Sequence, residues 1–183
     1  MFSRKTEIEK ADLLGECLVG GATETATIIM EELGKRFGVG FRDGNVAPQF
    51  LIEVIVFYMH LIDRLAFVHL GVEKREAFGD RFIVAVVKEL LRELSREVSA
   101  DEFGRTLRDT YNQRQTQYAR YKALIPDKDA PLKDTLYWEF SKILFGLLDD
   151  QNPATLMFLD LFVADMTDAM LNKAMKVEAV LRS

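Results

Sequence analysis

The segment Phe50–Phe67, FLIEVIVFYMHLIDRLAF, is the strongest indication of the fold class of this chain. As a helix it would carry apolar side chains on every side, which is typical of a helix enclosed by other helices. Four ionisable residues interrupt the apolar run: Glu53, His60, Asp63 and Arg64. Because each would cost several kcal/mol in hydrocarbon, a membrane span is disfavoured. The segment therefore predicts the central helix of a soluble all-α protein.

Signals for helix ends recur along the chain, whereas strand patterns are nearly absent. Thr6 with Glu9 has the spacing of a capping box, in which two side chains satisfy free backbone amides at a helix start. Ser99 with Glu102 repeats this spacing. Glycine favours helix ends, and proline favours first turns. On this basis the other predicted starts are Asn45 with Pro48, Pro131, and Asn152 with Pro153, and the predicted ends are Gly38, Gly71 and the residues before Pro126.

A pair of adjacent glycines, Gly20 and Gly21, is expected to weaken or break the first helix. Counting the boundaries gives six or seven helices, and the last is expected to extend almost to Ser183. Helices joined by short connections tend to pack antiparallel, so we predict a mainly antiparallel helical bundle. The chain of 183 residues is close to the size of one domain, so a single domain spanning residues 1–183 is expected.

Composition and charge argue against several classes of function. The net charge of -5 and the pI of about 5.2 disfavour a long-range field that would gather nucleic acid or anionic membrane. Cys17 is the only cysteine, which excludes an internal disulfide and a cysteine zinc cluster. Charged residues interrupt the N-terminal apolar runs before they reach the length of a signal peptide. We therefore expect a cytoplasmic protein with no nucleic-acid partner and no membrane partner.

The ionisable residues of the central helix form a candidate binding cluster. Glu53, His60 and Arg64 recur at spacings that place them on one narrow face, with Asp63 beside them. Buried charges are tolerated when they are paired and hydrogen-bonded, so each of these residues should have a partner inside the protein.

One partner can be nominated from a later helix. In the segment FGRTLRDTYNQRQTQYARYKALI, Arg114 falls within a stripe of apolar residues and should therefore face inward. The planar guanidinium group suits a bidentate contact with a carboxylate. We predict that Arg114 binds Glu53 or Asp63. In the following helix, Glu139 and Lys142 are expected at the solvent edge.

The cluster allows two interpretations, and a satisfied network of internal salt bridges is favoured over a ligand site. The ligand site would lie between helices and would use Glu53, His60, Asp63, Arg64 and Arg114. A metal is a weaker alternative, with Glu53, His60 and Asp63 as ligands and Asp160 added if the acidic row of the last helix faces His60. The Glu-x-x-His motif of di-iron bundles does not occur. No cofactor can be named from the sequence.

The sequence favours a protein that works by association rather than by catalysis. It holds 13 Phe, 7 Met and 5 Tyr, and segments such as TLMFLDLFVADM are apolar on more than one helical face. We expect a homo-oligomer or a protein partner as the first hypothesis, and a small-ligand or metal-binding bundle as the second. An enzyme that uses the cluster for acid–base chemistry has no motif to support it.

Overall fold

The computed structural model describes residues 5–41, 46–93, 100–121 and 135–183, except for the side chains of residues 100–103 and 174. Its helices are α1 (Glu7–Phe37), α2 (Val46–Glu93), α3 (Ala100–Tyr118), α4 (Leu136–Gly146), α5 (Pro153–Asp168), a π-helical turn η1 (Ala169–Ala174) and α6 (Val177–Arg182). These residues contain no strand, and one isolated bridge joins Phe41 to Leu148. The all-α class predicted from the sequence is confirmed.

The predicted count of six or seven helices is not matched. Among the described residues five helices have 11 residues or more, and η1 and α6 are short extensions beyond α5. Of the weakening or break expected at Gly20 and Gly21, the break is absent, because α1 runs through both glycines without interruption. Each glycine weakens a helix by about 0.5–1 kcal/mol, and the packing of an amphipathic face outweighs that cost.

Helix α2 consists of two arms that meet at Gly71. The backbone of Gly71 has φ 78° and ψ 175°, a conformation that L side chains rarely adopt and glycine adopts readily. The first arm comprises residues 46–70 and the second comprises residues 72–93. The predicted helix end at Gly71 is therefore present as a sharp bend, after which the chain continues directly as a second helix.

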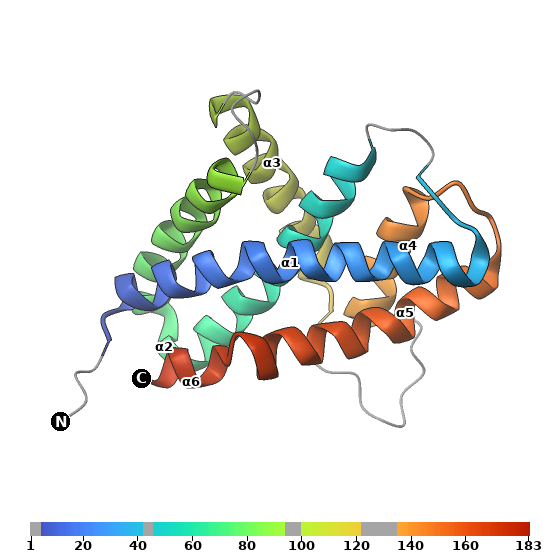
Figure 1. Cartoon of the computed structure of the whole chain (residues 1–183). Helices are drawn as coiled ribbons and strands as arrows, with labels where there is room; N and C mark the ends of the chain where they lie inside the picture. The colour runs from blue at the N-terminus through green and yellow to red at the C-terminus, as the bar shows by residue number, and fades with distance from the viewer. Residues whose placement is uncertain (1–4, 42–45, 94–99, 122–134) are drawn as a thin grey trace.

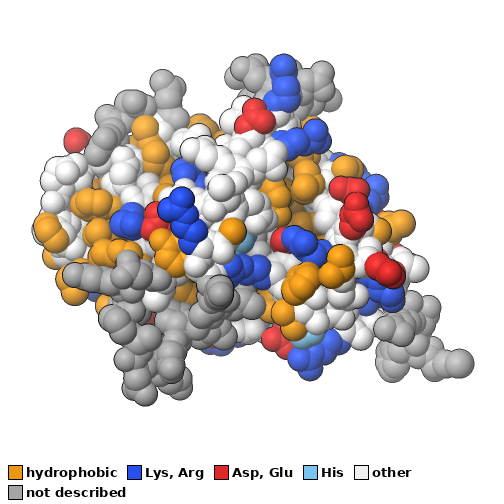
Figure 2. All heavy atoms as spheres, turned by 180° about the vertical axis from the view of Figure 1, so that it is seen from behind, with side chains coloured by type: hydrophobic (Ala, Val, Ile, Leu, Met, Phe, Trp, Pro, Cys, Tyr) orange, Lys and Arg blue, Asp and Glu red, His pale blue; other side chains and the backbone are white. Residues whose placement is uncertain are grey.

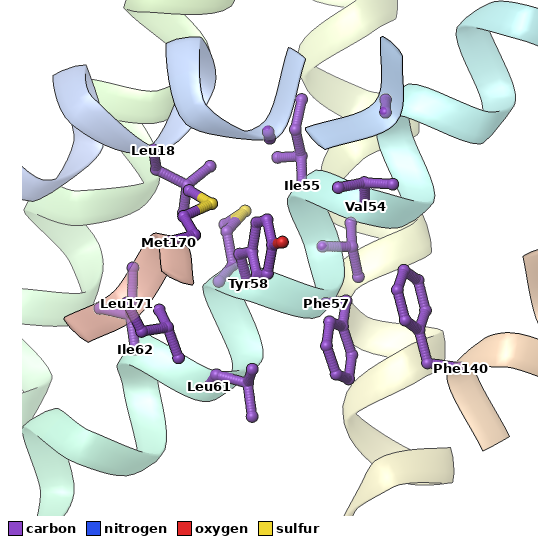
Figure 3. Close-up of a cluster of buried hydrophobic side chains, with 14 of the residues drawn as sticks. Leu18, Val54, Ile55, Phe57, Tyr58, Leu61, Ile62, Phe140, Met170 and Leu171 are labelled. Atoms are coloured by element: carbon purple, nitrogen blue, oxygen red, sulfur yellow. The ribbon is translucent and has the colours of Figure 1, made fainter. Parts of the chain in front are cut away.

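The two arms of α2 form a V, and α1 crosses both of them (Figure 1). Helix α5 runs antiparallel to α1 and lies beside it, and α4 packs against α5. The core lies between these layers. Figure 3 shows Leu18 of α1, Ile62 of α2 and Met170 of η1 pointing into one cluster of apolar side chains. Nearby, the rings of Phe57 and Phe140 stack with centroids 4.0 Å apart.

Several predicted helix ends are confirmed by their capping contacts. The capping box of Thr6 and Glu9 is formed, and Gly38 ends α1 in the left-handed conformation. The side chain of Asn152 accepts a hydrogen bond from the amide of Ala154 at the start of α5. The following predictions lie outside the described residues or side chains: Ser99 with Glu102, Asn45, Pro126 and Pro131.

Helix α1 is the one described helix that is long and apolar enough to cross a membrane, with a mean hydropathy of 1.2 over its most apolar window. The core helix of a water-soluble protein passes the same test. In the fold, the buried residues of α1 face α2, α5 and α6. The length of α1 is therefore weak evidence, and the cytoplasmic location and the absence of a membrane partner stay predictions.

Candidate functional site

Glu53 and Arg114 form a buried ion pair between the first arm of α2 and α3. The Nε and Nη2 atoms of Arg114 donate to the two carboxylate oxygens of Glu53 at 2.8 and 2.7 Å. Gln49 donates a further hydrogen bond to Glu53 at 3.1 Å. The Glu53 side chain is only 2% exposed, so both of its oxygens depend on these partners. The predicted contact between Arg114 and a carboxylate of the cluster is confirmed.

The network continues from Arg114 to α4. Nη1 of Arg114 donates to Gln117 at 2.8 Å, and the amide nitrogen of Gln117 donates to Glu139 at 2.7 Å. The hydroxyl of Tyr121 and the ammonium of Lys142 also bind Glu139. Lys142 is exposed, as predicted. Glu139 is only partly buried, with a side chain 14% exposed, and it receives three hydrogen-bond donors.

Of the two carboxylates proposed for Arg114, Glu53 is the one bound, and Asp63 pairs with an arginine that the sequence analysis did not nominate. The Nε and Nη2 atoms of Arg75 donate to its two oxygens at 2.8 and 2.6 Å. Arg75 lies twelve residues further along, on the second arm of α2. The bend at Gly71 turns the second arm back toward the first, so that Arg75 can reach Asp63 although both belong to α2. Sequence spacing alone missed Arg75, because a straight helix would place it far from Asp63.

His60 is buried and binds a polar side chain of α3. Its Nδ1 atom lies 2.8 Å from Oε1 of Gln115, and the amide nitrogen of Gln115 donates to the hydroxyl of Tyr111. In this arrangement Nδ1 of His60 carries the proton and Nε2 is a bare acceptor. Burial lowers the pKa of His60 to about 4, so the ring is neutral at pH 7. Nε2 has no hydrogen-bond partner among the residues described.

Arg64 caps the C-terminal end of α3 by binding backbone carbonyl groups. Its Nη2 atom donates to the carbonyl oxygen of Tyr118 at 3.2 Å and to that of Tyr121. Carbonyl groups at a helix end lack partners within the helix, and a guanidinium group satisfies them and complements the helix dipole. Burial lowers the pKa of Arg64. The second amino group, Nη1, is buried and has no partner within the described part of the chain.

The five predicted ligand residues therefore surround the interface of α2 and α3 but form separate contacts. Glu53 binds Arg114, Asp63 binds Arg75, His60 binds Gln115, and Arg64 binds backbone carbonyls. This arrangement supports the interpretation as an internal network over a single ligand site built from all five residues. It leaves two unsatisfied atoms, Nε2 of His60 and Nη1 of Arg64.

The structure does not bring together the four candidate metal ligands Glu53, His60, Asp63 and Asp160. In the described ranges no group of three His, Cys, Asp or Glu side chains is arranged to hold a metal ion. Guanidinium groups occupy both oxygens of Glu53 and of Asp63. Asp160 lies on α5, is 1% exposed, and has no hydrogen-bond partner in the described structure for either oxygen. Burial raises the pKa of Asp160 to about 6.

A hollow of about 430 Å³ borders the cluster at the bend of α2. Its polar wall includes His60, Arg64 and Arg75, and its apolar wall includes Phe67 and Val68. Phe67 and Val68 are 51% and 65% exposed, so the apolar wall is open to solvent. The guanidinium of Arg75 lies over the ring of Phe67 at 5.8 Å from its centroid.

A larger groove of about 800 Å³ lies between the second arm of α2 and α3. Its apolar lining is Ile83, Val84, Val87 and Leu91. The polar lining is entirely basic and consists of Lys88, Arg105 and Arg108. Lys88 and Arg108 form no ion pair with another described residue. An apolar floor with basic side chains around it suits an apolar surface that carries acidic groups.

Helix α5 carries an exposed apolar surface with acidic side chains. Met157 and Leu161 are 63% and 55% exposed, and Asp165 and Asp168 are exposed further along the same stripe. The spacing of these residues, four, four and three, keeps them on one face of the helix. We call these four residues the α5 stripe. On the face seen in Figure 2, apolar side chains also reach the surface in several places between charged ones.

No protein-family model matches the chain, and no match was found among the curated proteins or the solved structures.

Proposed function

We propose that this is a non-catalytic helical protein that acts by self-association, with the α5 stripe of one copy seated in the groove between α2 and α3 of another. The charged residues of the central cluster bind one another or backbone, which favours a structural role for most of them over acid–base chemistry. The association therefore rests on surface features outside that cluster.

The observation that carries the proposal is the match between the groove and the stripe. Met157 and Leu161 supply exposed apolar side chains for the apolar floor of the groove. Asp165 and Asp168 supply two negative charges for a rim that contains Lys88 and Arg108. From Met157 to Asp168 the stripe is about 16 Å long at 1.5 Å per residue. Apolar burial would supply most of the affinity, and the opposite charges would fix the register.

The proposed assembly is a two-fold dimer in which the contact is made twice. Each copy offers one groove and one stripe, so a two-fold axis lets both grooves take the stripe of the other copy. Two contacts together should reach the range of about 1,000 Å² or more that stable interfaces bury. A single head-to-tail contact would instead extend into open chains.

Light scattering after size-exclusion chromatography tests the association. The chain of 20.9 kDa should run as a dimer at micromolar concentration and dissociate on dilution. Leu161→Asp should shift the protein to monomer, because it places a charge on the apolar floor of the groove. Val72→Ser is the matched control, since Val72 is 69% exposed and lies outside both surfaces.

A monomer at every concentration would contradict self-association and would leave the groove for a different protein with an acidic apolar helix. A dimer that Leu161→Asp and Val72→Ser affect equally would show that the contact lies elsewhere.

A further inference from the structure

The hollow beside the bend of α2 has features that the proposed self-association does not use. It lies at the bend of α2, where His60 and Arg64 of the first arm and Arg75 of the second arm line it, whereas the groove lies further along the second arm. His60 and Arg64 are separated by one helical turn. Each has one buried polar atom that the fold leaves without a hydrogen-bond partner in the described structure. Such atoms call for a physical explanation, because an unsatisfied buried polar group is costly.

The two unsatisfied atoms have opposite hydrogen-bonding characters. Nε2 of His60 is an acceptor, because Nδ1 faces the carbonyl oxygen of Gln115 and the ring is neutral. Nη1 of Arg64 is a donor, because every guanidinium nitrogen carries N–H groups and has no acceptor lone pair. The bonds to the carbonyls of Tyr118 and Tyr121 are made by Nη2, so they do not use Nη1. A ligand that satisfies both atoms must therefore present one acceptor and one donor.

The charges around the hollow favour an anion. Arg64 and Arg75 contribute two positive charges and Asp63 contributes one negative charge, so the net charge is +1 with His60 neutral. Arg75 uses Nε and Nη2 for Asp63, which leaves Nη1 outside that ion pair. Both arginines line the hollow, and a pair of guanidinium groups suits a carboxylate. The exposed Phe67 and Val68 offer an apolar surface beside it.

We propose that this hollow binds a small organic acid with one carboxylate and an adjacent hydroxyl group. The carboxylate lies between the Nη1 groups of Arg64 and Arg75, and the hydroxyl donates to Nε2 of His60. A short apolar substituent packs on Phe67 and Val68. Nε2 of His60 and Nη1 of Arg64 are both buried, so both side chains must shift toward the hollow for the ligand to reach them.

Calorimetric titration with two probes, lactate and propionate, tests the assignment, because these acids differ by one hydroxyl group. Lactate should bind at least about tenfold more tightly, since propionate leaves the acceptor of His60 unsatisfied. In His60→Phe the preference should fall to about one, because the acceptor is gone. In Arg75→Lys both acids should bind about tenfold more weakly and the preference should remain, since the single ammonium group of lysine cannot replace the guanidinium that binds Asp63 and the ligand together.

Two further probes and one control variant define the ligand class. Methyl lactate, which lacks the carboxylate, should give no heat. Inorganic phosphate should bind more weakly than lactate, because it offers no apolar substituent for Phe67 and Val68. Lys142→Gln is the matched control, as Lys142 is an exposed basic residue bound to Glu139 and outside the hollow.

No heat with lactate at tens of millimolar would overturn the proposal, as would a preference that persists in His60→Phe or phosphate that binds as well as lactate. If His60→Phe does not fold, the ¹⁵N resonance of His60 Nε2 in the unsubstituted protein provides the readout. It should shift with lactate and stay unchanged with propionate, and equal shifts would overturn the role of His60. The titration is repeated on Asp165→Lys/Asp168→Lys, so that a failure of self-association is distinguished from a failure of this site.

Discussion

Gly15 of α1 lies so close to Ala85 of α2 that a Cβ atom on Gly15 would stand 2.5 Å from the Cβ of Ala85. The backbone of α1 therefore rests directly on the second arm of α2. The arm of α2 that α1 contacts here also lines the groove that faces α3. In the described part of the chain, the fold depends on glycine at the bend at Gly71 and at the close approach at Gly15, in addition to the left-handed helix end at Gly38.

Gly15→Ala is expected to destabilise the protein by about 1–3 kcal/mol, because the new methyl group can be accommodated only if the two helices separate. Gly20→Ala is the matched control on the same helix, since a Cβ there meets nothing within 4 Å. This control should stabilise the protein by about 0.5–1 kcal/mol through helix propensity. Urea unfolding followed by circular dichroism measures both, and equal effects would mean that α1 does not rest on α2 as described.

Arg114→Ala should reduce the free energy of unfolding by about 3–5 kcal/mol, because it strands the buried carboxylate of Glu53. Arg182→Ala is the control, because Arg182 and Glu178 form an exposed pair with side chains 65% and 50% accessible. Its loss should cost about 0–1 kcal/mol. Replacing Glu53 and Arg114 together by leucine should recover most of the stability, and a double variant as unstable as Arg114→Ala would argue against a paired network.

The pH dependence of stability should contain two opposed contributions. Burial raises the pKa of Asp160 from 3.8 to about 6. The stabilising contribution of this carboxyl group to the free energy of unfolding is therefore fully present below pH 3.8 and is lost as the pH rises through about 6. Burial lowers the pKa of His60 from 6.5 to about 4, so its contribution is present above pH 6.5 and is lost as the pH falls through about 4. Each is on the order of 3 kcal/mol.

Single substitutions should separate the two contributions. In Asp160→Asn only the His60 contribution remains. The free energy of unfolding should therefore fall from pH 6.5 toward pH 4 more steeply than in the unsubstituted protein. Above pH 6 the variant should be more stable than the unsubstituted protein, because it carries no buried charge at position 160. In His60→Gln only the Asp160 contribution remains, so the free energy of unfolding should rise as the pH falls from 6.5 toward 4. Denaturant unfolding at a series of pH values gives both curves, and parallel curves for all three proteins would show that neither residue titrates as described.

Local rules predicted the helix ends where the determining contacts lie within one turn. Thr6 with Glu9 and Asn152 with Pro153 are of this kind, since the side chain and the amide that it binds are neighbours in sequence. The predicted break at Gly20 and Gly21 does not occur, because contacts between residues far apart in the sequence decide whether this helix continues. Tertiary packing of α1 decides the continuity of that helix, and a local propensity scale does not contain it.

The cluster was predictable as buried, whereas most of its partners were not. An apolar run around Glu53 indicates burial, and the inward face of Arg114 indicates one partner. Arg75 reaches Asp63 only through the backbone angles of Gly71, which residue spacing does not reveal. Gln115 adjoins Arg114 on a helix that faces the cluster, and this adjacency is the signal that could have identified it as the partner of His60.

Two charge-reversed variants test whether the α5 stripe binds the groove of a second copy. Lys88→Glu/Arg108→Glu makes the rim of the groove acidic, and Asp165→Lys/Asp168→Lys makes the α5 stripe basic. Alone, each variant brings like charges together and should remain monomeric. Mixed, the acidic groove meets the basic stripe and the unchanged groove meets the unchanged stripe, so both contacts of a two-fold heterodimer become favourable.

Light scattering of each variant alone and of their equimolar mixture is the decisive measurement. The two variants should be monomers alone and should form a heterodimer on mixing, at a concentration where the unsubstituted protein is a dimer. Monomers that stay separate on mixing, or variants that still dimerise alone, would contradict the seating of the α5 stripe in the groove between α2 and α3.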